Sequence, residues 1–327
     1  MRRVVLAVFL VLGLAACVPV VENLGPTPVI SGATFATTPF AAPTATSDED
    51  ATWQTAYEVL GRGRPVVMIH GIGGGSSLFQ YRFNAPEVAS AGYRVYALDL
   101  VGFGRSTRPD VRLDADAMVA QVTAFLEDVV GEPAVLVANG LSAAHAIRLA
   151  ATRSELVAGL VLIGPTGYER LARPQTPARE RWFDLLRGPL GELLTSFLVE
   201  EDGQLYYLSQ SYADRASLTP EVRASFDTNL KAPGARWVVF SFVTGNLDQD
   251  VSDWWPLTTQ PSLIVFGTEP SFTRIEDAEP FLAARPDAGF LPLEGAKVLP
   301  NEERAEAFNE AVLAFLEDIG WGAPSFR

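Results

Sequence analysis

Short apolar segments alternate with stretches of helical periodicity along most of this chain, and no other feature restricts its possible folds as much. The expected strands are residues 65–70, 94–98, 134–138, 160–163, 262–266 and 289–293, and the expected helices are residues 115–130, 141–151 and 302–316. Strands that alternate with helices usually form a parallel sheet that is covered by helices on both faces. The sequence therefore predicts the α/β class, with a mostly parallel sheet flanked by helices.

The strand pattern stops in residues 166–260, where the apolar residues follow helical spacing instead. The larger side chains of this stretch are Trp182, Leu185, Leu186, Leu193, Leu194, Tyr206, Tyr207, Trp237, Trp254 and Trp255. Ligands of open α/β sheets bind at the carboxyl ends of the strands. We interpret residues 166–260 as a helical lid over that end, with its aromatic side chains in the core of the lid rather than in a specific ligand cage. Residues 53–165 and 261–321 then form the core domain.

The amino-terminal segment has the pattern of a targeting signal. Arg2 and Arg3 precede an apolar run, Val4 to Ala16, that is too short to span a bilayer. The run LAAC, which ends at Cys17, resembles a bacterial lipobox, and this resemblance implies cleavage before Cys17 and acylation of that residue. We therefore expect residues 1–16 to be a lipoprotein signal peptide. The alternative is an ordinary signal peptide, or a short anchor, that happens to contain a cysteine.

This interpretation implies a protein that is exported and lipid-anchored to the cell membrane, with its domain on the extracytoplasmic side. Residues 17–52 are rich in Pro, Thr and Ala and show no sustained hydrophobic period. Such a segment buries too little apolar surface to offset its ordering entropy, so we expect a disordered tether. The alternative is a strand that packs on the domain, and residues 28–30 are the best candidates for it.

Composition excludes several classes of partner. Asp and Glu number 39 against 25 Lys and Arg, so the formal net charge is -14 and a nucleic-acid partner is not expected. The 2 His and 1 Cys leave little from which to build a metal site, and we expect neither a metal nor a cofactor. The sequence leaves the oligomeric state open.

Several separate motifs resemble the α/β-hydrolase superfamily, of the AB hydrolase-1 type, and they occur in the order of that fold. They are RPVVMIHGIGGGSS, ALDLVGFGRST, AVLVANGLSAAHAIRLAA, LVLIGPTG, SLIVFGTEPSFTRIEDAEPFL and EGAKVLPNEERAEAFNEAVLAFLED. The resemblance covers nearly all of residues 60–320 apart from the lid. It implies an oxyanion hole made by the backbone N–H groups of Ile72 and Leu141, and a structural role for His70.

The resemblance also marks the positions of the catalytic triad. The nucleophile elbow, a sharp strand-to-helix turn, corresponds to residues 138–142 and has Gly140 in the place of the nucleophile. The acid position holds Pro270, with Glu269 one residue away, and the base position holds Val298. Without an attacking oxygen and a base, no acyl-enzyme can form at these positions. The sequence thus indicates a pseudoenzyme with a degenerate triad.

An alternative frame for the elbow begins at Gly140 and makes Ser142 the nucleophile, with His145 on the same helix as its base. This frame supports a serine ester hydrolase with a displaced nucleophile. The leading hypothesis is instead a membrane-anchored protein that binds a small apolar molecule or ester without hydrolysing it. A third possibility is an interaction protein of the cell envelope, because fold alone does not select among these functions.

Overall fold

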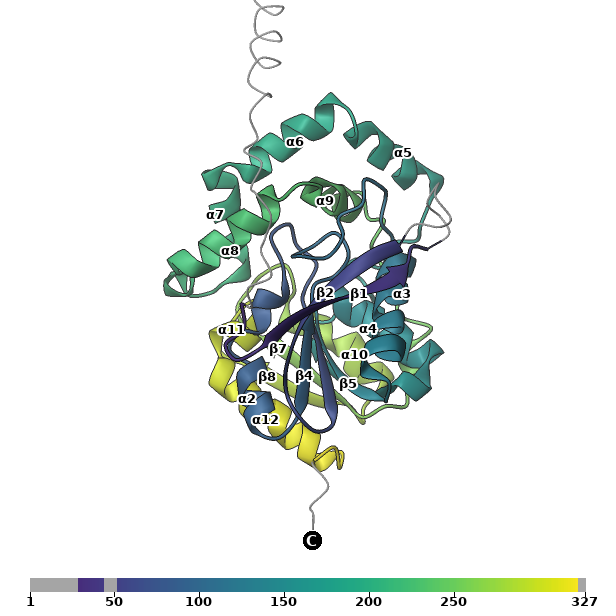
Figure 1. Cartoon of the computed structure of the whole chain (residues 1–327), viewed down its shortest axis with the longest axis vertical. Coiled ribbons are helices and arrows are strands. Elements are labelled where there is room, and N and C mark those ends of the chain that lie inside the picture. Colours follow the sequence, from purple (N-terminus) through teal and green to yellow (C-terminus); the bar gives the residue numbers. More distant parts are fainter. Residues whose placement is uncertain (1–28, 44–51, 323–327) are drawn as a thin grey trace, which may run out of the picture.

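The computed structural model describes residues 29–43 and 52–322, and its centre is an eight-stranded sheet with the order β1-β2-β4-β3-β5-β6-β7-β8 (Figure 1). The strands are β1 (Thr34–Ala41), β2 (Thr52–Gly61), β3 (Pro65–Ile69), β4 (Arg94–Leu98), β5 (Ala134–Asn139), β6 (Val157–Ile163), β7 (Ser262–Gly267) and β8 (Gly289–Leu293). The strands from β4 to β8 in this order are parallel, and β2 is antiparallel to both of its neighbours. The predicted α/β class with a mostly parallel sheet is confirmed.

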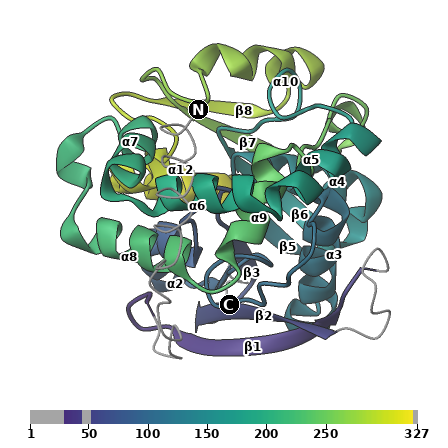
Figure 2. The ribbon, with the colours of Figure 1, turned by 90° about the horizontal axis from the view of Figure 1, so that it is seen from above.

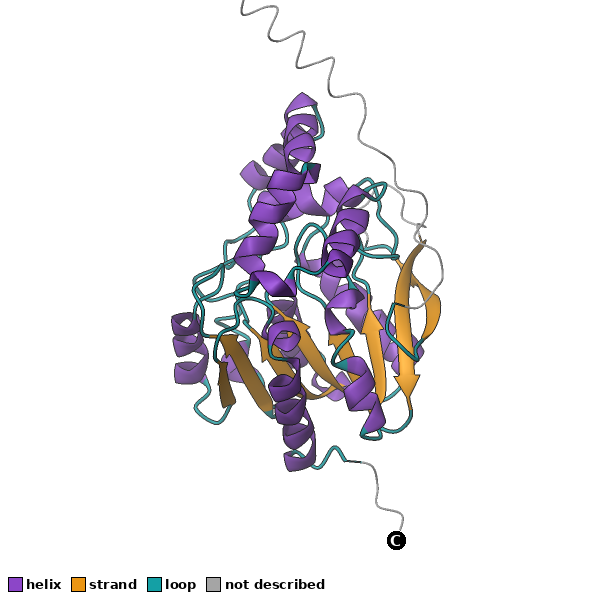
Figure 3. Ribbon diagram, turned by 90° about the vertical axis from the view of Figure 1, so that its left-hand side faces the viewer, coloured by secondary structure: helices purple, strands orange, loops and turns teal. Residues whose placement is uncertain are grey.

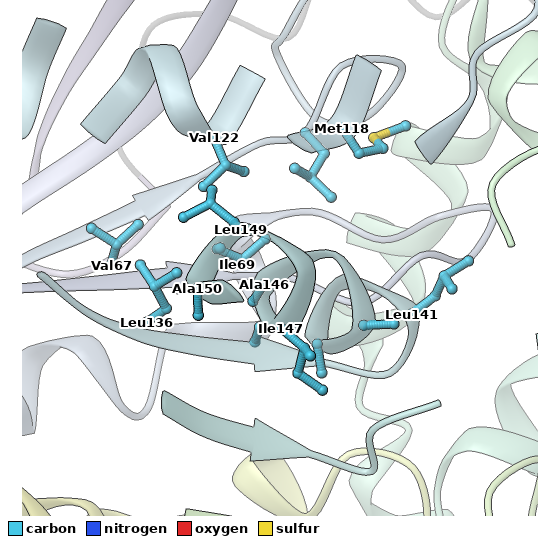
Figure 4. Close-up of a cluster of buried hydrophobic side chains, with 14 of the residues drawn as sticks. Val67, Ile69, Met118, Val122, Leu136, Leu141, Ala146, Ile147, Leu149 and Ala150 are labelled. Atoms are coloured by element: carbon cyan, nitrogen blue, oxygen red, sulfur yellow. The ribbon is translucent and has the colours of Figure 1, made fainter. Parts of the chain in front are cut away.

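Helices cover both faces of the sheet, because the central strands are apolar on both sides. In β3, Val66 and Met68 join a core with α2 (Ala85–Ser90) and α12 (Ala305–Asp318), whereas Val67 and Ile69 join the opposite core. Figure 4 shows this second core, in which Val67 and Ile69 lie with side chains of α3 (Ala115–Phe125) and α4 (Leu141–Thr152). Successive side chains of a strand point to opposite faces of the sheet. A strand that is covered on both faces therefore consists of consecutive apolar residues.

The ends of the helices follow from local residues. Asp114 begins α3 by accepting a hydrogen bond from the N–H of Ala117, at 3.0 Å. The helix expected over residues 115–130 ends in a π-helical turn, after which Gly131 adopts a left-handed φ of 70°. The expected helix at 302–316 is divided into α11 (Pro300–Glu303) and α12, and α10 (Glu279–Ala284) precedes β8.

The insertion between β6 and β7 is helical, as expected. Its cap helices are α5 (Pro177–Leu186), α6 (Pro189–Val199), α7 (Glu201–Ser211), α8 (Pro220–Lys231) and α9 (Ala235–Val243). They lie above one end of the sheet in Figure 3, and Figure 2 shows α6 and α9 crossing over it. Residues that follow the carboxyl ends of β3, β5 and β6 share a cavity with residues of α7 and α8, so the cap covers that end.

The side chains of the insertion are not all in a core, and that prediction needs correction. Trp237 packs with Phe183 and Phe240 between the cap helices, and Trp255 is fully buried in the main core. Trp182, Leu185, Leu193 and Tyr206 are instead exposed on the cap surface. Helical spacing located the helices, but it did not show which of their apolar faces has a partner.

The prediction of a disordered tether over residues 17–52 is wrong for Thr34–Ala41. This segment pairs along its whole length with β2 as an edge strand. Just before it, Ile30 is buried, and the buried Glu58 carboxylate accepts the N–H groups of Val29 and Ile30 at 2.7 and 2.8 Å. Pairing with the free edge of β2 and hydrogen bonds to Glu58 order this segment, although its composition does not predict an ordered structure.

The signal peptide, Cys17 and the remaining parts of the predicted tether, residues 18–28 and 44–51, lie outside the described residues. Within residues 29–43 and 52–322, no helix has the length and apolar character needed to cross a membrane.

Candidate functional site

A cavity of about 340 Å³ lies between the carboxyl ends of the central strands and the cap helices. Its floor consists of the loops that follow β3, β5 and β6, and its roof consists of residues from α7 and α8. Most of its wall is apolar, and the main apolar side chains are Ile72, Phe79, Leu171, Leu208, Val222, Phe226, Phe242, Phe272 and Leu299. A cavity of this size and character suits a small apolar molecule.

Gly140 lies on the floor of the cavity, at the turn between β5 and α4. Its backbone has φ 59° and ψ -121°, a left-handed conformation that strains any other residue. Its N–H donates to the carbonyl of Ile163 at 2.8 Å, which ties the turn to β6. A Cβ atom on Gly140 would have no heavy atom within 4 Å apart from its chain neighbours. The turn keeps the elbow shape and leaves the space of the nucleophile open.

Ile72 and Leu141, whose backbone N–H groups the sequence resemblance assigns to an oxyanion hole, also line the cavity. In the part of the chain that the structure describes, neither N–H donates to another protein group. Leu141 is the first residue of α4, where the helix dipole adds positive potential. These two groups are therefore free to donate to an oxygen of a ligand.

The positions of the base and the acid have different surroundings. Val298 lines the cavity, and its carbonyl accepts a hydrogen bond from the side-chain amide of Asn139 at 3.1 Å. Pro270 and Glu269 are not among the lining residues and border a separate groove instead. The structure thus brings Gly140 and Val298 to one cavity and leaves the expected acid position outside it.

His70 has a structural role, as expected. Its Nε2 accepts the N–H of Leu100 at 3.0 Å, so the proton is on Nδ1, which donates to the carbonyl of Gly71 at 2.8 Å. Burial lowers the pKa of His70 and keeps the ring neutral. The two ring nitrogens thus join the loop that carries Ile72 to the loop after β4, and neither is available for proton transfer.

The alternative pair, Ser142 and His145, lies below the cavity floor. Ser142 is 1% exposed, and its hydroxyl donates to the carbonyl of His70 at 2.7 Å. The Nε2 of His145 bonds to the carbonyl of Leu247 at 3.0 Å, and burial lowers the pKa of His145 to about 4. Within the described chain, no hydrogen bond joins the two side chains, and neither lines the cavity beneath the cap. This geometry offers no support for a nucleophile at Ser142.

Two polar residues of the wall, Glu302 and Tyr207, were not predicted to line it, although Tyr207 was expected in the core of the lid. Glu302 is buried beside the cavity, where it pairs with Arg82 and accepts the hydroxyl of Tyr212 at 3.0 Å. Burial raises the pKa of Glu302, against the opposing effects of Arg82 and Tyr212. Tyr207 also lines the cavity, and burial raises its pKa to about 12. No local motif marks these residues, because distant segments bring them together.

A metal site is not evident in the described ranges. No group of 3 or more His, Cys, Asp or Glu side chains within residues 29–43 and 52–322 has an arrangement that could hold a metal ion.

The sequence is similar to one protein family and to several individual proteins. A model of the alpha/beta hydrolase family matches residues 66–311. A 2-hydroxy-6-oxononadienedioate/2-hydroxy-6-oxononatrienedioate hydrolase of Pseudomonas sp. is 28% identical over 77% of this chain and 87% of its own. The AB hydrolase superfamily protein YisY of Bacillus subtilis is 23% identical over 79% of this chain and 93% of its own.

Solved structures show the same fold. A serine hydrolase involved in carbazole degradation superimposes with a TM-score of 0.69 at 22% identity, covering 87% of this chain and 99% of that one. A thermophilic esterase from Thermogutta terrifontis gives a TM-score of 0.68 at 20% identity, with the same coverage.

Proposed function

The chain belongs to the alpha/beta hydrolase family, and we propose that it binds a small, mostly apolar ligand in the cavity of this fold without hydrolysing it. The observation that carries the proposal is the turn at Gly140. It has the geometry of a nucleophile elbow and open space above it, but it has no side chain that could attack a carbonyl. Val298 at the base position cannot accept a proton.

The ligand is expected to have one polar end. A carbonyl or carboxylate oxygen placed over Gly140 would accept hydrogen bonds from the free N–H groups of Ile72 and Leu141. The rest of the molecule would lie against aromatic and aliphatic side chains of the cap, such as Phe226 and Phe272. The name of the Pseudomonas relative specifies a small organic diacid, which is consistent with an oxygen-bearing polar end.

The proposal includes the cellular setting inferred from the amino terminus. We propose that the protein is exported, acylated on Cys17 and held at the outer side of the cell membrane, as the resemblance of LAAC to a lipobox suggests. An anchored binding module of this kind would collect apolar molecules from the membrane or its surroundings. It would work as a receptor or carrier, not as a catalyst.

Octanoic acid and 4-nitrophenyl octanoate are suitable probes, because each combines an oxygen-bearing end with a short apolar chain. We expect calorimetry to detect saturable binding of octanoic acid, and the ester to be hydrolysed no faster than in buffer. The variant Ser225→Trp, which fills the cavity from α8, should weaken binding at least about tenfold, or about 1.4 kcal/mol. The neighbouring exposed residue provides the control Ala224→Trp, which should bind normally.

Two results would overturn the proposal. Ester turnover that is lost in Ser142→Ala would identify a hydrolase with a displaced nucleophile. Absence of binding by either probe, together with recovery of an envelope protein in a pull-down, would favour the interaction protein.

A further inference from the structure

The outer surface of the cap carries a row of large apolar side chains. Trp182 and Leu185 of α5 and Leu190, Leu193 and Phe197 of α6 are each between 45% and 59% exposed. The three residues of α6 are spaced i, i+3 and i+7 and therefore share one helical face. We refer to these five residues as the cap ridge. Folded proteins rarely expose so many neighbouring large apolar side chains without a function.

The cap ridge faces away from the rest of the molecule. The opposite sides of these helices already have partners, because Phe183 and Leu186 of α5 pack against Trp237 and Phe240 of α9. In Figure 1, α5 and α6 are the helices that lie farthest from the sheet. No element within the described residues covers the ridge.

The point at which the described chain begins indicates which side a lipid on Cys17 would hold near a membrane. The described chain begins at Val29, which borders a groove together with Glu221 and Thr228 of α8, a cap helix. Its N–H is fixed there by Glu58. Only residues 18–28 separate Val29 from Cys17, and a fully extended chain of this length spans about 40 Å. A lipid on Cys17 would therefore hold the cap end of the molecule close to the bilayer.

We propose that the cap ridge rests in the surface of a lipid bilayer, with α5 and α6 lying along it. This inference relies on the lipid anchor included in the proposed function. It adds a docked orientation in which the roof of the cavity is close to the membrane. Apolar ligands could then pass between the bilayer and the cavity without crossing much water.

The charges near the cap ridge indicate whether docking on a bilayer requires anionic lipids. Arg187 pairs with Asp110, and Arg236 pairs with Glu192, so these cations are already neutralised. On α5, Glu180 pairs with Arg112, and the exposed Arg181 and Asp184 have opposite charges. Contact with the membrane would thus depend on burial of apolar side chains and not on attraction to anionic headgroups. Vesicles of pure phosphatidylcholine should suffice, and salt should have little effect.

Quenching of tryptophan fluorescence by brominated lipid tests this contact. The full acylated chain is reconstituted into phosphatidylcholine vesicles with or without bromine in the acyl chains. We expect lower emission in the brominated vesicles, and we expect Trp182→Phe to remove most of this difference. The control Trp321→Phe, at the far carboxyl-terminal end of the domain, should leave the difference unchanged. A second variant, Leu193→Ser with Phe197→Ser, should also reduce quenching while Trp182 is retained.

Equal emission from both kinds of vesicle would overturn docking, as would failure of the chain to float with vesicles. A dimer in solution that the Leu193→Ser, Phe197→Ser variant dissociates would assign the ridge to a second copy instead. Quenching is measured without added ligand, so it is independent of octanoic acid binding. A protein that docks but does not bind octanoic acid would contradict only the proposed ligand.

Discussion

Asn139 donates from its side-chain amide to the main-chain carbonyl of Val298, across 3.1 Å. Asn139 directly precedes Gly140, and Val298 is the residue that the sequence resemblance places at the base position. The bond therefore joins the neighbour of the expected nucleophile position to the expected base position. Here the relationship maintains the shape of the cavity, because it fixes the loop after β8 against the end of β5.

The bond between Asn139 and Val298 leads to a prediction about stability. Asn139→Asp is isosteric, but it removes the donor and places a carboxylate against a carbonyl oxygen. We expect the free energy of unfolding to fall by about 1–3 kcal/mol, the usual effect of an unpaired buried polar group. Urea denaturation measures this, and Asp184→Asn on the exposed surface of α5 is the matched control. Equal stability of Asn139→Asp and wild type would show that the loop is held by other contacts.

Restoring a hydroxyl to the elbow should not restore catalysis. In Gly140→Ser the side chain would have room, but the left-handed φ would lower the free energy of unfolding by about 1–3 kcal/mol. Gly131→Ser is a matched control, because Gly131 also has a positive φ and open surroundings but lies at the surface. We expect no labelling of either variant by a fluorophosphonate, since Val298 has no proton acceptor in its side chain and the Glu302 carboxylate on the same cavity is already paired with Arg82. Labelling of the Gly140→Ser variant at its new hydroxyl would instead reveal a proton acceptor close to the elbow.

The buried His145 predicts a pH dependence of stability. Its pKa in the folded state is about 4, against an ordinary value of 6.5, so the unfolded chain binds the proton more tightly. Its contribution to stability is fully present above pH 6.5 and is lost as the pH falls from 6.5 to 4, by about 3 kcal/mol in total.

The variant His145→Gln keeps an amide donor for the carbonyl of Leu247 and does not titrate. Its free energy of unfolding should therefore decline less than that of the wild type between pH 6.5 and 4. Denaturant titrations at several pH values would measure both proteins, and His70 is present in both. Parallel pH profiles would mean that His145 does not remain neutral in the folded state.

Glu58 should determine whether the edge strand remains attached. The variant Glu58→Gln loses one of the acceptors that hold Val29 and Ile30, and it leaves Arg105 with one carboxylate fewer. We expect hydrogen exchange in β1 to accelerate at least about tenfold, and stability to fall by about 2–4 kcal/mol. Glu87→Gln, at an exposed residue of α2, is the control. Unchanged exchange in β1 would show that the strand pairing alone holds it.

Much of the fold could be predicted because the central strands are buried on both faces. Continuous apolar runs such as 65–69 are typical of strands that are buried on both faces, and the helices between them follow a clear period. The edge strand β1 could not be predicted in this way. Only Phe40 is buried along its length, so pairing with β2 and the bonds to Glu58 determine its position.

The floor of the candidate site was also accessible from sequence, since Ile72, Gly140 and Leu141 belong to motifs with fixed local geometry. The rest depends on long-range packing. Glu302 lies on α11, after β8, and lines the cavity. Pro270 lies after β7, as expected, but it borders a separate groove. No local sequence motif predicts the position of either residue.

The two edge strands of the sheet, β1 and β8, each contain a proline. Pro39 lies within β1 and Pro292 lies within β8, and proline has no N–H to offer an approaching strand. Each border therefore presents an interrupted row of donors to other molecules. If many copies of the protein are concentrated on one membrane surface, the missing donors disfavour pairing between the edge strands of neighbouring copies. The copies would then remain separate molecules.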